Sequence, residues 1–465
     1  MVRSPRVQRV AFLAAALAAC NGPFDAPNQN YGTLEDLRSN PSRAAVLAAT
    51  LGLLTGTRAS FGFNAQTLGI LGREGYNLDV SNPQAIPNWY TVLSPNLAAG
   101  VWTNGYQVFK QANVVTAALD RVTDTNRVTG MTDAEKEGVR GFAQTIKALN
   151  LLYVIRGTDA SGAALEVPDD PTSPPPPIVG KGQVYARISQ LLDSGSTHLA
   201  SAGTAFAFRL PAGFKGFDTP ATFLRFNRAI RARVDVEIGD FAAALTDLAG
   251  SFLDTTADLS LGVYHTFSTN SGDVQNPLFD PTARQRYAHP SYTADAQLQA
   301  DGVTKDNRFV TKIRAIVPSF TRYGFVVSWT FQRYNSLSDP APIIRNEELI
   351  QLRAEANIGL GNTSAAIADI NVVRRESGLL PPISDPYVAV GNEPPTLLDE
   401  LLYEKRYSLM WENGDRWVDL RHYGKLAPLP KDRPGDLIFP YLSIPTDECV
   451  PRSPQPPGCQ TPAGF

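Results

Sequence analysis

Five charged residues near the C-terminal end of the chain have the types and spacing that acid–base chemistry requires. They are Glu404, Arg406, Glu412, Arg416 and Asp419. Glycosidases use two carboxyl groups about 5 to 10 Å apart. Glu412 and Arg416 are spaced i,i+4, however, which favours a carboxylate–guanidinium pair at a helix end. We therefore predict that these charges are structural and that the chain has no catalytic residues, with a carbohydrate-active enzyme as the less favoured alternative.

A second set of residues suits the recognition of sugars. A sugar presents apolar C–H faces and rings of hydroxyl groups, so its site needs flat aromatic side chains beside polar ones. An early loop and a late loop-rich segment contain such residues: Arg73, Tyr76, Asn77, Trp89, Tyr90, Trp329, Arg333 and Tyr334. We predict that they form a ligand-binding site. The alternative is that Trp89 and Trp329 are core or partner-interface residues.

Composition excludes several other functions. The 465 residues are 43% apolar and 19% charged, with a formal net charge of −3, which is ordinary for a globular protein and gives no basis for binding nucleic acid. The four histidines, His198, His265, His289 and His422, lack the spacing of metal ligands. We therefore expect no metal, no cofactor and no nucleic-acid partner.

The N-terminus has the pattern of an export signal. Three arginines precede an apolar stretch from Val10 to Ala19 that is about half the ~20 residues a membrane-spanning helix needs. The stretch ends in Leu17-Ala18-Ala19-Cys20, which resembles the lipobox of bacterial lipoproteins. We predict a signal peptide over 1–19, a lipidated Cys20 that anchors the chain to a membrane, and a flexible tether over 20–33. A plain secretory signal followed by a free cysteine is the alternative.

Helical periodicity organises most of the remaining chain. A helical scaffold is predicted over about 34–252 and 341–425, with a loop-rich insertion and short β-strands over about 253–340 and a proline-rich tail over about 426–465. The expected helices are Leu34–Thr55, Ala98–Leu119, Ala134–Arg156, Val184–Leu199 and Arg345–Leu360. Thr132 and Glu135 form a capping box before the third of these helices.

An internal repeat indicates how the helices are paired. Gly239-Asp240 and the following segment 243–248 match Gly361-Asn362 and 365–370, at a constant offset of 122 residues. In each copy, a glycine closes one helix and a second helix follows, with a pair of alanines that permits close packing. This is the construction of tetratricopeptide-like helical hairpins. The predicted fold class is therefore mainly α, built from such hairpins and carrying an irregular insertion.

Three blocks of sequence resemble the SusD/RagB family of outer-membrane nutrient-binding lipoproteins. Segment 344–356 is similar to the family pattern R-x-A-E-x-L-L-x-x-A-E-A, and segment 366–374 to A-x-x-x-I-N-x-V-R. The third block spans 402–425 and includes the family's E-G-x-R motif, which Asn413 lengthens by one residue. Ser408 stands where many members have Glu. Weaker matches extend the resemblance over nearly the whole mature chain.

The resemblance implies a function without bond chemistry. A member of this family would be anchored to the outer membrane through a lipid on Cys20 and be exposed at the cell surface. It would bind an oligosaccharide or a peptide and deliver it, as a lid, to a SusC-like TonB-dependent β-barrel transporter. The competing hypothesis is a helical-repeat scaffold lipoprotein that binds only protein partners.

The two cysteines other than Cys20 are candidates for a disulfide. Cys449 and Cys459 are an even pair in an oxidising compartment, ten positions apart in the proline-rich tail. We predict a disulfide between them, which for so short a loop contributes ~2 to 3 kcal/mol.

Overall fold

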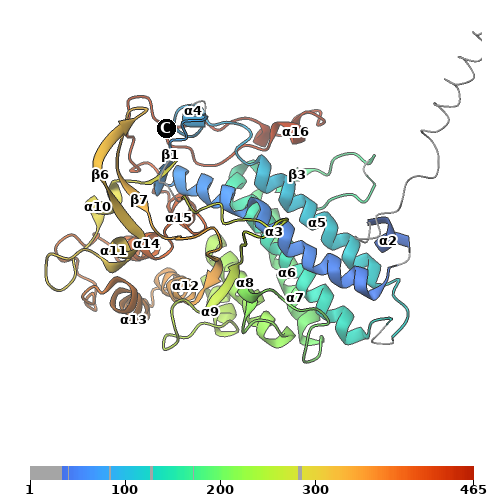
Figure 1. Ribbon diagram of the computed structural model, residues 1–465. Helices are drawn as coiled ribbons and strands as arrows, with labels where there is room; N and C mark the ends of the chain where they lie inside the picture. Colours follow the sequence, from blue (N-terminus) through green and yellow to red (C-terminus); the bar gives the residue numbers. More distant parts are fainter. Residues whose placement is uncertain (1–33, 40, 83–84, 126–128, 171, 281–284) are drawn as a thin grey trace, which may run out of the picture.

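The computed structural model describes residues 34–39, 41–82, 85–125, 129–170, 172–280 and 285–465 (Figure 1). The predicted signal peptide, tether and lipidation site at Cys20 lie outside these ranges. Helices dominate the described residues, and the strands there form two-stranded sheets. The predicted fold class, mainly α with short strands, is confirmed.

The N-terminal half is a layer of long helices. Its α-helices are α2 (Leu34–Ser39), α3 (Arg43–Leu71), α4 (Ala85–Tyr90), α5 (Ala99–Leu119), α6 (Asp133–Thr158), α7 (Lys181–Ala200) and α8 (Pro220–Ile238). Helix α3 packs on α5 and α6, α6 packs on α7, and α7 packs on α8 (Figure 1). Thr132 and Glu135 form the predicted capping box at the start of α6. The sequence thus placed α5, α6 and α7 correctly to within a few residues.

Helix α3 differs from its prediction. The expected helix Leu34–Thr55 is instead two helices, and the second continues 16 residues further, to Leu71, through a stretch that its glycines marked as a loop. These glycines lie where α3 meets other segments. A Cβ at Gly56 would lie 2.4 Å from Val108, and one at Gly62 would lie 1.9 Å from Pro277. The glycines are therefore contact points within a helix, and α3, although long and apolar enough to cross a membrane, packs inside the fold.

The internal repeat corresponds to two helical hairpins. The first joins α8 to α9 (Phe241–Ala249), and the second joins α12 (Asn346–Gly359) to α13 (Thr363–Val373). Gly239 and Gly361 have φ angles of 79° and 77°, in the left-handed region that glycine adopts without strain. Helix α12 also packs on α8 and α9, and Gly359 lies against the ring of Phe241. The two predicted hairpins therefore stack on each other.

The insertion lies beside the hairpins and carries four of the eight strands of the described residues, β4 to β7. The strand pairs are β1 (Gly75–Asn77) with β5 (Arg286–Ala288), β2 (Ala163–Ala164) with β3 (Ile178–Val179), β4 (Gly262–His265) with β8 (Ala341–Arg345), and β6 (Ile313–Arg322) with β7 (Phe325–Phe331). All four pairs are antiparallel. Two short helices, α10 (Ser291–Asp295) and α11 (Asn307–Lys312), complete the insertion. In Figure 1 the β6–β7 hairpin lies on the opposite side of the molecule from α5, α6 and α7.

The C-terminal segments close the structure. They are α14 (Leu397–Ser408), α15 (Asp415–His422) and α16 (Thr446–Cys449), and single turns of other helix types occur at Asp159–Ser161, Ala212–Phe214, Arg374–Gly378 and Pro457–Cys459. The tail was expected to have no regular structure, yet it forms α16 and buries apolar side chains such as Ile438 and Ile444. The indole nitrogen of Trp417 donates to the carbonyl of Phe439 at 3.0 Å. Cys449 and Cys459, the pair predicted from the sequence, are joined by a disulfide.

The contact between the hairpins gives a stability prediction. Gly359→Ala removes a helical glycine, which on propensity alone would stabilise the protein by up to about 1 kcal/mol. The new Cβ would lie 2.1 Å from the ring of Phe241, so we expect a net loss of about 1 to 3 kcal/mol in the free energy of unfolding. Gly182→Ala, in the first turn of α7, is the control because nothing lies within 4 Å of its Cβ position. Urea denaturation should show a lower midpoint for the first variant alone; equal midpoints would contradict the close packing.

Candidate ligand-binding site

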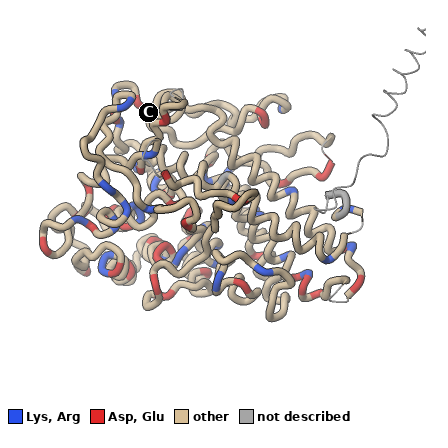
Figure 2. Tube along the Cα trace, in the orientation of Figure 1, with Lys and Arg blue, Asp and Glu red and all other residues tan. Residues whose placement is uncertain are grey.

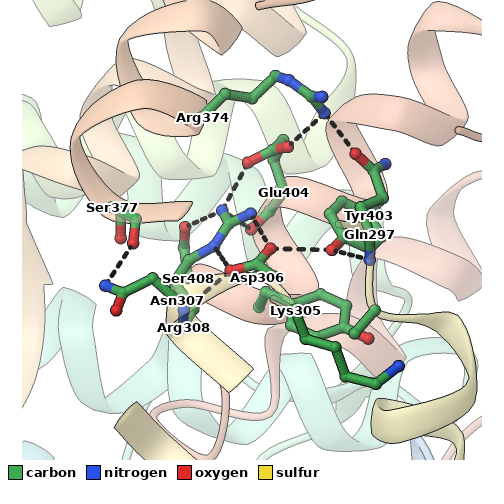
Figure 3. Close-up of polar contacts among 12 residues, drawn as sticks. Gln297, Lys305, Asp306, Asn307, Arg308, Arg374, Ser377, Tyr403, Glu404 and Ser408 are labelled. Carbon is green, nitrogen blue, oxygen red and sulfur yellow. Dashed lines mark hydrogen bonds and ion pairs between the residues drawn. The ribbon is translucent and has the colours of Figure 1, made fainter. Parts of the chain in front are cut away.

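A buried network of charges joins the insertion to the helical scaffold (Figure 3). Arg308 of α11 contacts Glu404 of α14 at 2.5 Å and forms a two-pronged ion pair with Asp306, at 2.9 and 2.5 Å. Arg374, which follows α13, contacts the other oxygen of Glu404 at 3.2 Å and pairs with Glu400. The side chains of Arg308 and Glu404 are 1% and 0% exposed. These groups therefore hold three separate segments together out of contact with water.

Ser408 extends this network to α12. Its hydroxyl accepts hydrogen bonds from Arg308 at 3.1 Å and from Gln351 at 2.9 Å, and it donates to Glu347 at 2.5 Å. Glu347 in turn pairs with Arg345. Ser408, the position at which the sequence departs from the family pattern, is thus a central member of a buried polar cluster.

The predicted pair between Glu412 and Arg416 is wrong. Glu412 instead pairs with Arg333 and Arg345, each at 3.1 Å, and Arg416 donates to the carbonyl of Arg73 at 2.9 Å. The two residues are not on one helix, because α15 begins at Asp415 after Gly414 in a left-handed conformation. The i,i+4 spacing therefore does not place their side chains together.

Two carboxyl groups of α14, those of Glu400 and Glu404, are enclosed by other side chains. Glu400 and Glu404 are both fully buried, and Arg374 bridges them. Burial, together with the charge of Glu404, raises the pKa of Glu400 to about 8. This pair resembles a shared-proton dyad in its electrostatics, but the surrounding side chains enclose it.

Five of the eight predicted ligand-binding residues lie in the core. Arg73, Tyr76, Trp89, Tyr90 and Tyr334 are 1%, 1%, 4%, 0% and 5% exposed. Their predicted role as an exposed sugar platform is therefore wrong in this structure. The error arises because aromatic residues in a glycine- and proline-rich segment can pack against another segment distant in sequence, which local patterns do not reveal.

The structure nevertheless brings the early loop and the insertion together. Strand β1 pairs with β5, and Tyr76 and Tyr90 each pack on Phe325 of β7, with ring centroids 4.7 and 4.8 Å apart. The hydroxyl of Tyr76 donates to Asp432 at 2.9 Å, and Arg73 donates to the carbonyl of Pro430 at 3.0 Å. The rings that were expected to hold a ligand therefore hold these two segments and the tail to one another.

The other three predicted residues, Asn77, Trp329 and Arg333, are half-buried. The ring of Trp329 meets Phe309 edge-on at 5.4 Å. Arg333 pairs with Glu412, as described above, so its guanidinium is already engaged. Of the predicted aromatic residues, Trp329 thus keeps the most surface for a ligand.

Two polar cavities were not foreseen from the sequence. One, of about 330 Å³, is walled by paired charges that include Arg156, Arg233 and Glu348. The other, of about 390 Å³, lies between α10, α14, α15 and the loop at 392–394, and is lined by Arg406 and Arg416. In the sequence, the charges on these helices have the pattern of solvent-exposed helix faces. For the first cavity, the signal that could have revealed it is α12, which contributes Glu348 and Glu355 to the wall and is polar on several sides although it lies at the centre of a repeat.

Other ligand classes find little support among the described residues. In those ranges, no group of three or more His, Cys, Asp or Glu side chains is placed to hold a metal ion. Basic and acidic residues are interspersed along the trace in Figure 2. The charge pattern therefore does not suggest a polyanion-binding face.

The network in Figure 3 gives a second prediction. Arg308→Met removes the only cation that pairs with Asp306 among the described residues and one of the two that pair with Glu404, both carboxylates being 0% exposed, so we expect the free energy of unfolding to fall by about 3 to 5 kcal/mol. Arg375→Met is the matched control, because its pair with Glu376 has side chains 64% and 54% exposed and should contribute less than about 1 kcal/mol. Thermal and urea unfolding of the two variants would measure the difference. Similar decreases in the free energy of unfolding for both variants would show that the buried network contributes no more to stability than an exposed ion pair.

Known proteins match this chain in structure but not in the sequence comparisons. No family model matches the sequence, and no curated protein matches it. Solved structures do match: a SusD superfamily protein from Bacteroides thetaiotaomicron has a TM-score of 0.65 at 15% identity, covering 93% of this chain and 100% of its own. One from Bacteroides vulgatus has a TM-score of 0.64 at 14% identity, covering 89% and 98%. A SusD-like carbohydrate binding protein from Bacteroides fragilis has a TM-score of 0.63 at 13% identity, covering 82% and 86%. The likeness extends over nearly the whole of both chains, and the protein has the fold of the SusD superfamily.

Proposed function

We propose that the protein is a surface lipoprotein that binds an oligosaccharide or another polymer-derived nutrient and delivers it, as a lid, to a TonB-dependent outer-membrane transporter. The observation that carries this proposal is the SusD-like fold across 89 to 93% of the chain in the two SusD superfamily structures. The predicted export signal and the lipobox-like segment that ends at Cys20 support it, since such a signal would direct the chain out of the cytoplasm.

The proposal requires no catalysis. Glu400 and Glu404, the carboxyl pair that Arg374 bridges, are sealed in a network that holds the insertion in place. Binding at an open surface would give a modest affinity, roughly millimolar to micromolar, or about −4 to −8 kcal/mol. Such an affinity suits a protein that must release its ligand to a transporter.

Partnership with a transporter gives a third prediction. We expect the full chain, extracted in mild detergent from the membranes of its own host, to co-purify with a plugged β-barrel protein that mass spectrometry would identify. Cys20→Ser, which removes the predicted lipid attachment, should abolish labelling by radioactive fatty acid and move the protein into the soluble fraction. Purification of the intact lipoprotein free of any barrel protein would count against the lid function and favour a scaffold that binds other proteins.

Sugar binding gives a fourth prediction, centred on Trp329. A glycan array should identify a ligand, and Trp329→Ala should weaken its binding about two- to tenfold, because an aromatic contact contributes about 0.5 to 1.5 kcal/mol. Val326→Ala is the control, since it truncates an exposed apolar residue on the same strand, β7. Unchanged affinity in the folded Trp329 variant would remove this residue from the site, and the absence of any glycan ligand would favour the protein-binding alternative.

A further inference from the structure

The cavity between α10, α14, α15 and the loop at 392–394, here called the Arg406–Arg416 cavity, lies outside the predicted sugar site. Its volume of about 390 Å³ is within the usual range for small-molecule sites. The walls combine two guanidinium groups with apolar side chains that include Pro394, Leu402 and Leu420. A ligand here would meet positive charge and apolar surface together.

The acidic side chains around this cavity are all paired. Asp295 lies 2.6 Å from Arg406, and Asp399 lies 2.8 Å from Lys425. Asp419 lies 2.6 Å from Lys405. Each of these three carboxylates therefore lies against another cation, although Asp419 shares Lys405 with Glu355, and none of the three forms an ion pair with Arg416.

Arg416 is the cation without a carboxylate partner. Its one hydrogen bond within the described ranges goes to the carbonyl of Arg73, at 2.9 Å, and no ion pair within 4.0 Å forms between it and a described acidic residue. Burial, with the positive charge of Arg406, lowers the pKa of Arg416 to about 9. A half-buried guanidinium in this condition would be stabilised by an anion entering the cavity.

Arg406 also lines the cavity and has one unsatisfied donor. More than nine-tenths of this residue is buried, and its terminal nitrogens bond Asp295 and Ser291, each at 2.6 Å. Its Nε atom is buried with no hydrogen-bond partner among the described residues. A buried donor in this state is energetically unfavourable.

The chemistry of the walls indicates the ligand class. A guanidinium group matches a carboxylate through two parallel hydrogen bonds, and apolar side chains suit the C–H face of a sugar ring. We propose that the Arg406–Arg416 cavity is a subsite for a carboxylate-bearing sugar, with the carboxylate on Arg416 and the ring against Leu402 and Leu420. The choice of a sugar rests on the proposed function, whereas the preference for an anion rests on the cavity itself.

Titration calorimetry on the purified chain tests this subsite. Glucuronate and galacturonate are the probes, with glucose and galactose as neutral sugars of matching ring geometry and acetate as the bare carboxylate. We expect at least one uronate to bind in the millimolar range or tighter, and at least tenfold more tightly than its neutral counterpart and than acetate. Equal binding of uronate and neutral sugar, or of uronate and acetate, would overturn the proposal, as would the absence of saturable uronate binding.

Three variants and one control locate the binding. Arg416→Gln should reduce uronate affinity at least tenfold, and Arg416→Lys should retain part of it. Because Arg416 also bonds the backbone, Ala294→Trp provides a second route: this exposed residue lines the cavity, and an indole there should block uronate without removing an existing contact. Ala300→Trp, at an exposed turn that does not line the cavity, is its control and should bind as the parent does. Undiminished uronate binding in a folded Ala294→Trp variant would overturn the proposal.

The outcome is separable from that of the proposed function. A chain that co-purifies with its transporter but does not bind uronates fails only in this subsite. A chain that binds uronates through Arg416 but has no barrel partner retains the subsite and loses the lid function.

Discussion

The structure depends on the burial of fully paired charges between the insertion and the helical scaffold. Charged groups removed from water are tolerated only when each has a partner of opposite sign and its remaining hydrogen bonds are satisfied. Arg308 and Arg374 meet this condition through Glu404, Asp306 and Glu400. Because the partners come from α11, α14 and the segment after α13, the network can form only when those segments have the observed arrangement. It thereby specifies the geometry of the insertion more strictly than apolar packing alone would do.

The same constraint explains why the E-G-x-R region looks like a catalytic motif. Acidic and basic residues at short intervals are required both by acid–base chemistry and by a buried ion-pair network. A catalytic group and a buried ion-pair group differ in their access to solvent and in the residues that contact them. The spacing of charged residues along the sequence reveals neither property. Glu412 illustrates the point, because its partners Arg333 and Arg345 lie 79 and 67 positions away.

Short-range sequence patterns correctly predicted the features that depend on neighbouring residues. The capping box at Thr132, the glycines at 239 and 361 and the apolar stripes of α5, α6 and α7 depend on residues within a few turns, and the structure shows each of them. The extent of α3 could not be predicted, because its glycines serve to allow close contact with Val108 and Pro277, which are distant in sequence. The sugar platform failed for a related reason: Tyr76 and Tyr90 pack on Phe325, some 240 residues away, a contact that their own loop does not encode. The Arg406–Arg416 cavity could not be predicted from the sequence, because its walls come from several separate segments.

The pairing of β4 with β8 has a consequence for how proteins of this fold can diversify. These strands, Gly262–His265 and Ala341–Arg345, lie near the two ends of the insertion and hold them side by side, about 4.8 Å apart. The helical hairpins on either side are thus insulated from changes in the length of the intervening segment, and each doubling of a flexible loop costs only about 0.6 kcal/mol. The residues of the insertion that contact the rest of the fold must be retained, among them those around Arg308, strand β5 and Phe325. A segment tied at its base and at these interior points can vary in sequence between them, which lets one scaffold acquire new surface chemistry without being rebuilt.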